Sequence, residues 1–159
     1  MTNFRFRLVV FVLCILLAPL ARAAGTSAIT YVSGISFGDF SVLGSCANCE
    51  ITINPSTGAR TATSGVILRS SNVGTRGQFS VTMTNCGGAN CSYTESVTPA
   101  SLSIATAGGT MTVLSFTSSQ TAMTSKANTI YVGATLRIPS VSVTAGTYTS
   151  GNFTVTTSN

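Results

Sequence analysis

The feature that most constrains the fold of this chain is an alternation of apolar and polar residues in short blocks. The longest block has apolar residues at every second position, namely Ile130, Val132, Ala134, Leu136 and Ile138. A period of two is that of a β-strand, whose successive side chains point to opposite faces of a sheet. Shorter blocks lie around residues 35–41, 51–53, 66–68, 79–83, 92–97, 102–104, 111–116 and 148–155. Such blocks, separated by turn residues, predict an all-β sandwich or barrel.

The composition favours the same fold class. Thr, Ser, Val and Gly are abundant, and residues 24–159 contain no long helix-forming run with an apolar period of 3.6 residues. β-branched side chains pack well on a pleated sheet. Along the chain we expect a kink at Gly38-Asp39, a turn from Pro55 to Gly58 and a long surface loop over residues 117–128.

The N-terminus has the three-part layout of a secretory signal peptide. Arg5 and Arg7 precede an apolar run over residues 8–17, and Ala21-Arg22-Ala23 supplies the small residues of a cleavage site. The run is too short to span a bilayer, which argues against the alternative of an N-terminal membrane anchor. We therefore expect residues 1–23 to be a signal peptide cleaved after Ala23, and residues 24–159 to form one secreted domain without stable membrane insertion.

Charged residues are few in the expected mature domain. Its cations are Arg60, Arg69, Arg76, Lys126 and Arg137, and its acids are Asp39, Glu50 and Glu95. The cations are scattered singly and form no patch or stripe. We therefore expect no nucleic-acid partner.

The residues needed for common enzyme chemistry are missing or scattered. The sequence has no histidine, which excludes a Ser-His triad, a histidine-ligated metal and imidazole acid-base catalysis. The three acids of the mature domain lie in separate blocks, and the glycines fall at turns instead of in a phosphate-binding loop. The sequence predicts a protein that is not an enzyme and needs no cofactor.

Four cysteines remain after signal cleavage, in two close pairs. Two residues separate Cys46 from Cys49, and four residues separate Cys86 from Cys91. Three interpretations are open: two disulfides, a zinc site with four thiolates, and a redox-active pair. Export favours disulfides, and the lack of a helix after either pair argues against the redox interpretation. Of the three possible disulfide pairings we favour the two local ones, each closing a short loop.

Several segments together resemble a known family. They are Ile35-Ser36-Phe37-Gly38-Asp39-Phe40, the turn over residues 54–60 with Gly65-Val66, the run over residues 131–136, and the ending Ala145-Gly146-Thr147-Tyr148 with Gly151 and Phe153-Thr154-Val155. In order and spacing they resemble a bacterial secreted domain of unknown function, which in turn resembles spore coat protein U and the archaic chaperone-usher pilins.

This resemblance implies an immunoglobulin-like antiparallel β-sandwich that lacks its final strand, in the bacterial periplasm or on the cell surface. It implies a fimbrial or coat-like subunit, whose groove is filled by a strand from the N-terminal extension of a neighbour. The candidate donor is Ala28 to Val32, with Ile29 and Tyr31 on one face. The implied partners are other subunits, in a homopolymer or with a chaperone or usher.

A second function is compatible with the same fold. The chain would then be a self-contained periplasmic or surface binding and adhesion module. Loops on a rigid sandwich are the usual place for such a site. The candidate loops are residues 44–49, 86–91 and 117–128.

Overall fold

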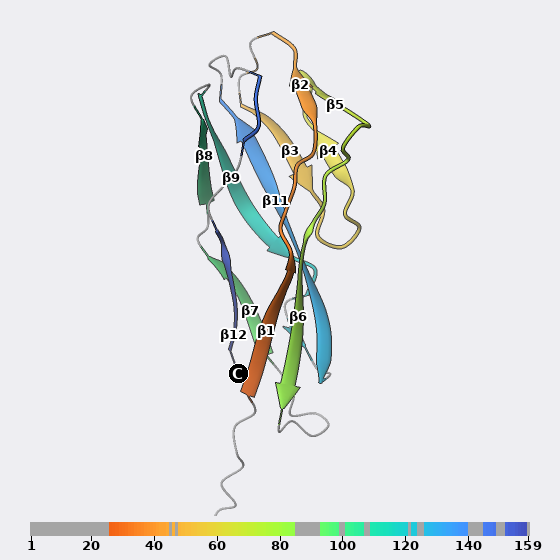
Figure 1. Cartoon of the computed structure of the whole chain (residues 1–159), viewed down its shortest axis with the longest axis vertical. Helices are drawn as coiled ribbons and strands as arrows, with labels where there is room; N and C mark the ends of the chain where they lie inside the picture. The colour runs from red at the N-terminus through yellow and green to blue at the C-terminus, as the bar shows by residue number, and fades with distance from the viewer. Residues whose placement is uncertain are drawn as a thin grey trace, which may run out of the picture.

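The computed structural model is built from antiparallel β-strands (Figure 1). It describes residues 26–44, 46, 48–84, 93–98, 101–106, 109–120, 122–123, 126–139, 145–148 and 152–158. Within these residues there is no helix, and so none that could cross a membrane. The strands are β1 (Thr26–Ser33), β2 (Phe40–Val42), β3 (Cys49–Ile53), β4 (Arg60–Ala62), β5 (Val66–Leu68), β6 (Gly77–Thr84), β7 (Tyr93–Thr98), β8 (Ser101–Thr106), β9 (Gly109–Ser118), β10 (Ala122–Met123), β11 (Ala127–Ile138) and β12 (Thr154–Ser158).

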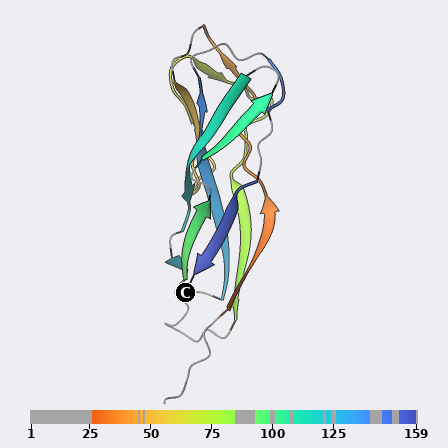
Figure 2. The same ribbon diagram turned by 90° about the vertical axis from the view of Figure 1, so that its left-hand side faces the viewer.

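The strands form one large sheet and two small ones. In the large sheet the order is β1-β6-β11-β3-β4, and β9 pairs with both β11 and β8. The second sheet has the order β10-β7-β12, and the third is the ribbon β2-β5. Viewed from the side, β7 and β12 form a layer in front of β11 and β6 (Figure 2). The fold is an antiparallel β-sandwich, as the alternation predicts.

The longest strand, β11, joins the two halves of the molecule. Residues 127–132 pair with β6, and residues 135–138 pair with β3 on the same side of the strand. Gly133 lies where β11 changes partner. A Cβ atom there would lie 2.1 Å from the carbonyl oxygen of Ile53 and 2.8 Å from the Cδ of Pro55. The β3 end therefore approaches the β11 backbone so closely that a side chain has no room.

A bulge in β9 faces the same part of β11. Gly133 pairs with Thr117 and Thr135 with Leu114, so two residues of β9 stand opposite one residue of β11. Ser115 has a φ of 54°, in the left-handed region, as one residue of a bulge often does. The bulge explains why the apolar residues of this strand change phase between Val113 and Phe116.

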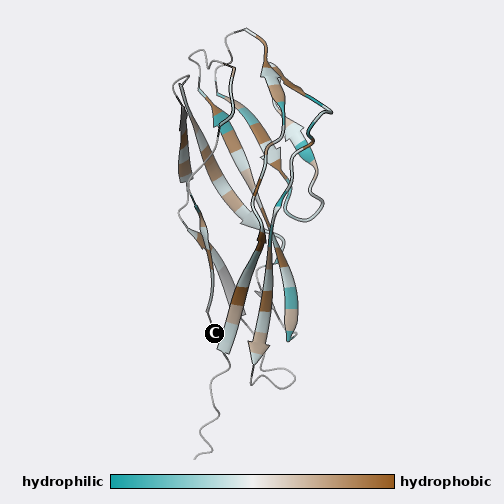
Figure 3. Cartoon of the chain, viewed as in Figure 1, coloured by the Kyte–Doolittle hydropathy of each residue, from teal (hydrophilic) through white to brown (hydrophobic). Residues whose placement is uncertain are grey.

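The buried residues form two clusters, one in each half. The first contains Phe79, Val81, Met83, Ile130, Val132 and Val155. The second contains Cys46, Cys49, Ile51, Ile104, Met111, Val113, Ala134, Leu136 and Ile138. Ile35 and Phe116 pack against both clusters, so the core is continuous. Colouring by hydropathy shows the alternation as bands along the strands (Figure 3).

The expected kink and turn are both present. Gly38 has a φ of 66°, and a Cβ there would lie 2.2 Å from the carbonyl oxygen of Asn72. The first expected strand is therefore divided into a bridge at Ser36 and the strand β2. In the turn, the Gly58 amide donates to the carbonyl oxygen of Asn54 at 2.8 Å. The Asn54 side chain also accepts from the amides of residues 56 and 57, so it fixes the turn.

The expected loop over residues 117–128 is wrong in its extent. Strand β9 continues to Ser118, β11 begins at Ala127, and β10 lies between them. Thr117 and Ser118 pair with β11 through the backbone although their side chains are polar. Alternation marks only strands with one buried face, so these strand ends carry no pattern. Val141 and Val143 alternate in the sequence as the residues of a strand do, but they lie outside the described residues.

Candidate functional site

Two strand edges lie next to each other in one half of the sandwich (Figure 1). Strand β1 is the edge of the large sheet and pairs with β6. Strand β12 is the edge of the three-stranded sheet and pairs with β7. Within the described residues, neither strand has a strand partner on its other side. Each therefore presents a row of backbone N–H and C=O groups outside any ladder.

The two edges touch through side chains. The Ser27 hydroxyl and the Thr157 hydroxyl are 2.6 Å apart and share one hydrogen bond. No backbone pairing joins β1 to β12 in the part of the chain that the structure describes. This contact is polar and part-buried, and it joins the facing inner sides of the two sheets.

An aromatic cluster lies beneath the two edges. The rings of Phe79 and Phe153 meet edge to face at 5.7 Å, and those of Phe116 and Phe153 stack at 5.2 Å. The Tyr31 ring of β1 meets Phe79 edge to face at 6.0 Å. Tyr31 is nevertheless 66% exposed, although it lies on the same side of β1 as the half-buried Ile29. The apolar core therefore reaches the surface at β1.

The candidate donor residues Ile29 and Tyr31 lie within the chain's own sheet. Ile29 pairs with Val81 and Tyr31 with Phe79, both in β6. No side chain of β1 is buried, whereas those of Phe79, Val81 and Met83 in β6 are. Donation of this segment to a neighbour would therefore require β1 to leave β6.

Cys46 and Cys49 form a disulfide bond, which is the local pairing favoured for them. Both are buried, and Gly65 packs against them: a Cβ there would lie 3.3 Å from the Cys49 sulfur. Cys49 begins a strand, so this pair does not lie at a helix N-terminus as a redox-active pair normally does. Cysteines joined to each other are not thiolate ligands, and the described residues hold no metal-binding group. The second pair, Cys86 and Cys91, lies outside those residues, so its disulfide stays a prediction.

The described carboxylates lie in different places. Glu50 pairs with Arg137 across β3 and β11 at 2.7 Å, in an exposed position. Asp39 accepts a hydrogen bond of 2.9 Å from the Ser71 hydroxyl. These are cross-strand and loop contacts, and they bring no second carboxylate close enough to share a proton or a metal.

Sequence reasoning identified β1 and the closing strand but missed that their edges meet. Residues 27 and 157 are far apart in the chain, and no motif links them. The aromatic residues of the cluster did appear in the alternating blocks of the sequence. That pattern was the available signal for the cluster.

These observations define the class of protein: an all-β sandwich domain in which two strand edges, unpaired among the described residues, lie over an apolar cluster. Comparison of the sequence with protein families shows that the chain belongs to the DUF4402 family, a domain of unknown function, which matches residues 28–158. Membership of a family of unknown function is as the sequence resemblance implied. Neither a curated protein nor a solved structure matches the chain.

Proposed function

We propose that this protein is a non-enzymatic structural protein, exported to the bacterial periplasm or cell surface, where it forms a fimbrial or coat-like subunit. Subunits assemble by β-strand addition at the edges of β1 and β12. The observation that carries the proposal is the juxtaposition of these two edges above an apolar cluster. An added strand would satisfy backbone groups and cover the exposed part of the core at Tyr31.

The composition of the two edges supports this use. Proteins usually protect an exposed strand edge with lysine, proline or another charge. Neither β1, with the sequence TSAITYVS, nor β12, with the sequence TVTTS, contains a charged residue or proline. Edges without these protections pair readily with other chains. Such edges suit a protein whose task is to assemble.

The partners in this proposal are other subunits. The resemblance to archaic pilins suggests what supplies the added strand. It is a second copy of the chain in a homopolymer, a chaperone or an usher. Ile29 and Tyr31 keep their proposed donor role only if β1 exchanges between subunits. If β1 stays in place, it lines the acceptor instead.

Two engineered disulfides test the proposal in the producing bacterium. The variant S27C/T157C ties β1 to β12, because the hydroxyl oxygens it replaces are 2.6 Å apart. The control T26C/T84C ties β1 to its own partner β6 on the exposed face, where the hydroxyl oxygens are 2.5 Å apart. Surface material is then examined by negative-stain microscopy and by chromatography under oxidising and reducing conditions, with unmodified protein treated alike.

The outcomes separate the possibilities. We expect oxidised S27C/T157C to remain monomeric and to assemble after reduction, because an incoming strand must part the two edges. Oxidised T26C/T84C still assembles if β1 lines the acceptor, and it stays monomeric if β1 is the donor. Normal assembly of both oxidised variants contradicts strand addition at this site.

The alternative function, a self-contained binding or adhesion module, is favoured by a separate observation. The described surface contains a polar cavity on the other side of β6, away from the β12 edge.

A further inference from the structure

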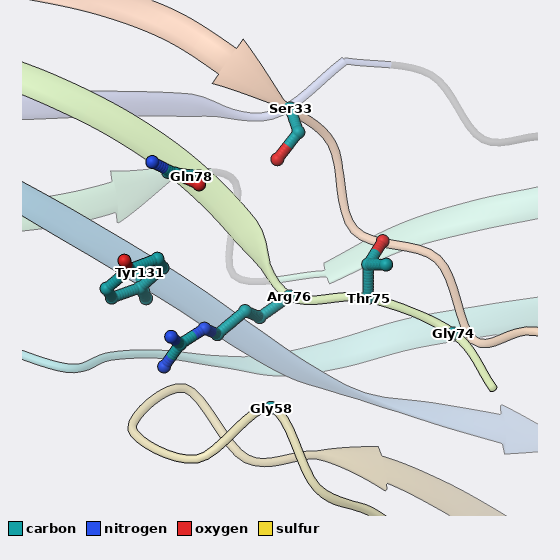
Figure 4. Close-up of a pocket in the computed structure, with 7 residues that line it drawn as sticks. All are labelled: Ser33, Gly58, Gly74, Thr75, Arg76, Gln78 and Tyr131. Atoms are coloured by element: carbon teal, nitrogen blue, oxygen red, sulfur yellow. The ribbon is translucent and has the colours of Figure 1, made fainter.

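A small open cavity lies where the end of β1, the start of β6, the middle of β11 and the turn before β4 meet (Figure 4). Its volume is about 350 Å³. Polar side chains and two glycines line it; the side chains are Ser33, Thr75, Arg76, Gln78 and Tyr131. None of these is a carboxylate. The volume is at the lower end of the range for small-molecule sites.

Arg76 is held in a fixed position at this cavity. Its Nη1 donates to the carbonyl oxygen of Pro55 at 2.8 Å and to that of Ser56. The guanidinium carbon lies 3.4 Å from the centre of the Tyr131 ring, which is a cation-π contact. The side chain therefore lies between Tyr131 and the turn that carries Gly58 (Figure 4).

These contacts use only one end of the guanidinium. Among the described residues, neither Nε nor Nη2 of Arg76 has a hydrogen-bond acceptor, and no carboxylate pairs with it. The other arginines near the turn and sheet differ. Arg60 donates to three backbone carbonyl groups, and Arg137 pairs with Glu50. Of these three, only Arg76 is held by the protein with no acceptor at either Nε or Nη2 among the described residues.

The Nε and Nη2 groups of an arginine form a fork that matches the two oxygens of a carboxylate. The rest of the cavity offers the hydroxyls of Ser33 and Thr75 and the amide of Gln78. These groups hydrogen-bond to hydroxyl groups, not to apolar ones. The Arg76 guanidinium already covers one face of the Tyr131 ring, which is the aromatic ring that lines the cavity. A ligand that suits both parts carries a carboxylate and several hydroxyls.

We propose that this cavity binds the carboxylate end of an acidic sugar, a uronate, with Arg76 as the carboxylate ligand and Gln78, Thr75 and Ser33 as partners of the sugar hydroxyls. Most of this site lies outside the two strand edges: only Ser33, the last residue of β1, belongs to one of them, and Thr75, Arg76, Gln78 and Tyr131 do not. It would allow the protein to attach to an acidic polysaccharide whether or not it assembles.

The test is a titration of the exported protein, followed by amide chemical shifts or calorimetry. The probes are glucuronate, glucose and propionate, which separate the sugar ring from the carboxylate. We expect glucuronate to bind, and glucose and propionate to bind at least about tenfold more weakly, because each supplies only part of the contacts. Binding should weaken as salt is raised.

Variants decide which residue is responsible. Arg76→Lys keeps the positive charge but removes the two-pronged donor of the guanidinium. Gln78→Glu places a carboxylate in the cavity, which competes with the ligand carboxylate for Arg76. Each variant should bind glucuronate about tenfold or more weakly than the unmodified protein. The control is Arg69→Lys. The Nε of Arg69 donates to Ser41 outside the cavity, so its replacement should leave glucuronate binding unchanged. Three results would overturn the proposal. They are undiminished glucuronate binding by either cavity variant, binding of glucose or propionate as tight as that of glucuronate, and no binding of glucuronate by the unmodified protein. A thermal melt of each variant identifies loss of fold. If Arg76→Lys does not fold, Gln78→Glu still tests the site, because it retains the contacts of Arg76.

Discussion

Replacing Gly133 by alanine should destabilise the sandwich strongly. The new Cβ would lie 2.1 Å from the carbonyl oxygen of Ile53 and 2.8 Å from two atoms of Pro55. Backbone atoms cannot move aside as the end of a flexible side chain can. The end of β3 must therefore shift away from β11, which strains the pairs between residues 135–138 and 49–52.

The size of the effect follows from these contacts. Inserting a methyl group into a well-packed site costs about 1–3 kcal/mol, and a contact with fixed backbone belongs at the upper end of that range, about 3 kcal/mol. For a domain of this size, such a loss lowers the melting temperature by about 10 °C. Since β11 joins both core clusters, the whole domain should unfold at the lower temperature in one transition.

The measurement is thermal unfolding of Gly133→Ala followed by circular dichroism. The matched control is Gly146→Ala, because nothing lies within 4 Å of a Cβ built at that position. The control should melt within about 2 °C of the unmodified protein, as exposed substitutions usually do. If Gly133→Ala melts as late as the control, the close approach of β3 to β11 does not limit the fold and the reasoning is refuted.

Two further predictions concern contacts between named pairs. The double variant C46A/C49A should lose about 2 kcal/mol, the chain-entropy value for so short a closed loop, and a denaturant midpoint that does not move would contradict this. Arg137→Ala should change the free energy of unfolding by less than about 1 kcal/mol, because the side chains of its ion pair with Glu50 are 48% and 30% exposed. A larger loss of stability in a denaturant titration would show that this pair contributes more than exposed pairs do.

Burial differs between β1 and β6, which pair with each other in the large sheet. One face of β6 is buried, at Phe79, Val81 and Met83, whereas β1, which pairs beside β6 in the same sheet, has no buried side chain. A strand held mainly by backbone hydrogen bonds is well suited to an edge where another strand can join. This relation explains why the apolar core extends to Tyr31.

Much of the fold could be predicted from the sequence. The alternating residues of β3, β6 and β11 are the buried ones, and Gly38 and Gly58 have the positive φ angles of a kink and a turn. These predictions succeed because one buried face imposes a period of two on the chain. Strand ends without a buried face, such as Thr117 and Ser118, left no such pattern and were taken for a loop.

The sequence by itself therefore determined the fold class and the positions of the main strands. Only the tertiary structure decided which edges lack a strand partner in the described part of the chain, that residues 27 and 157 meet, and that Arg76 stacks on Tyr131 beside an open cavity. The physical reason is that periodicity reports which face of a strand is buried. It does not report which other strand lies beside it, because pairing joins residues far apart in the chain through backbone groups that every residue carries.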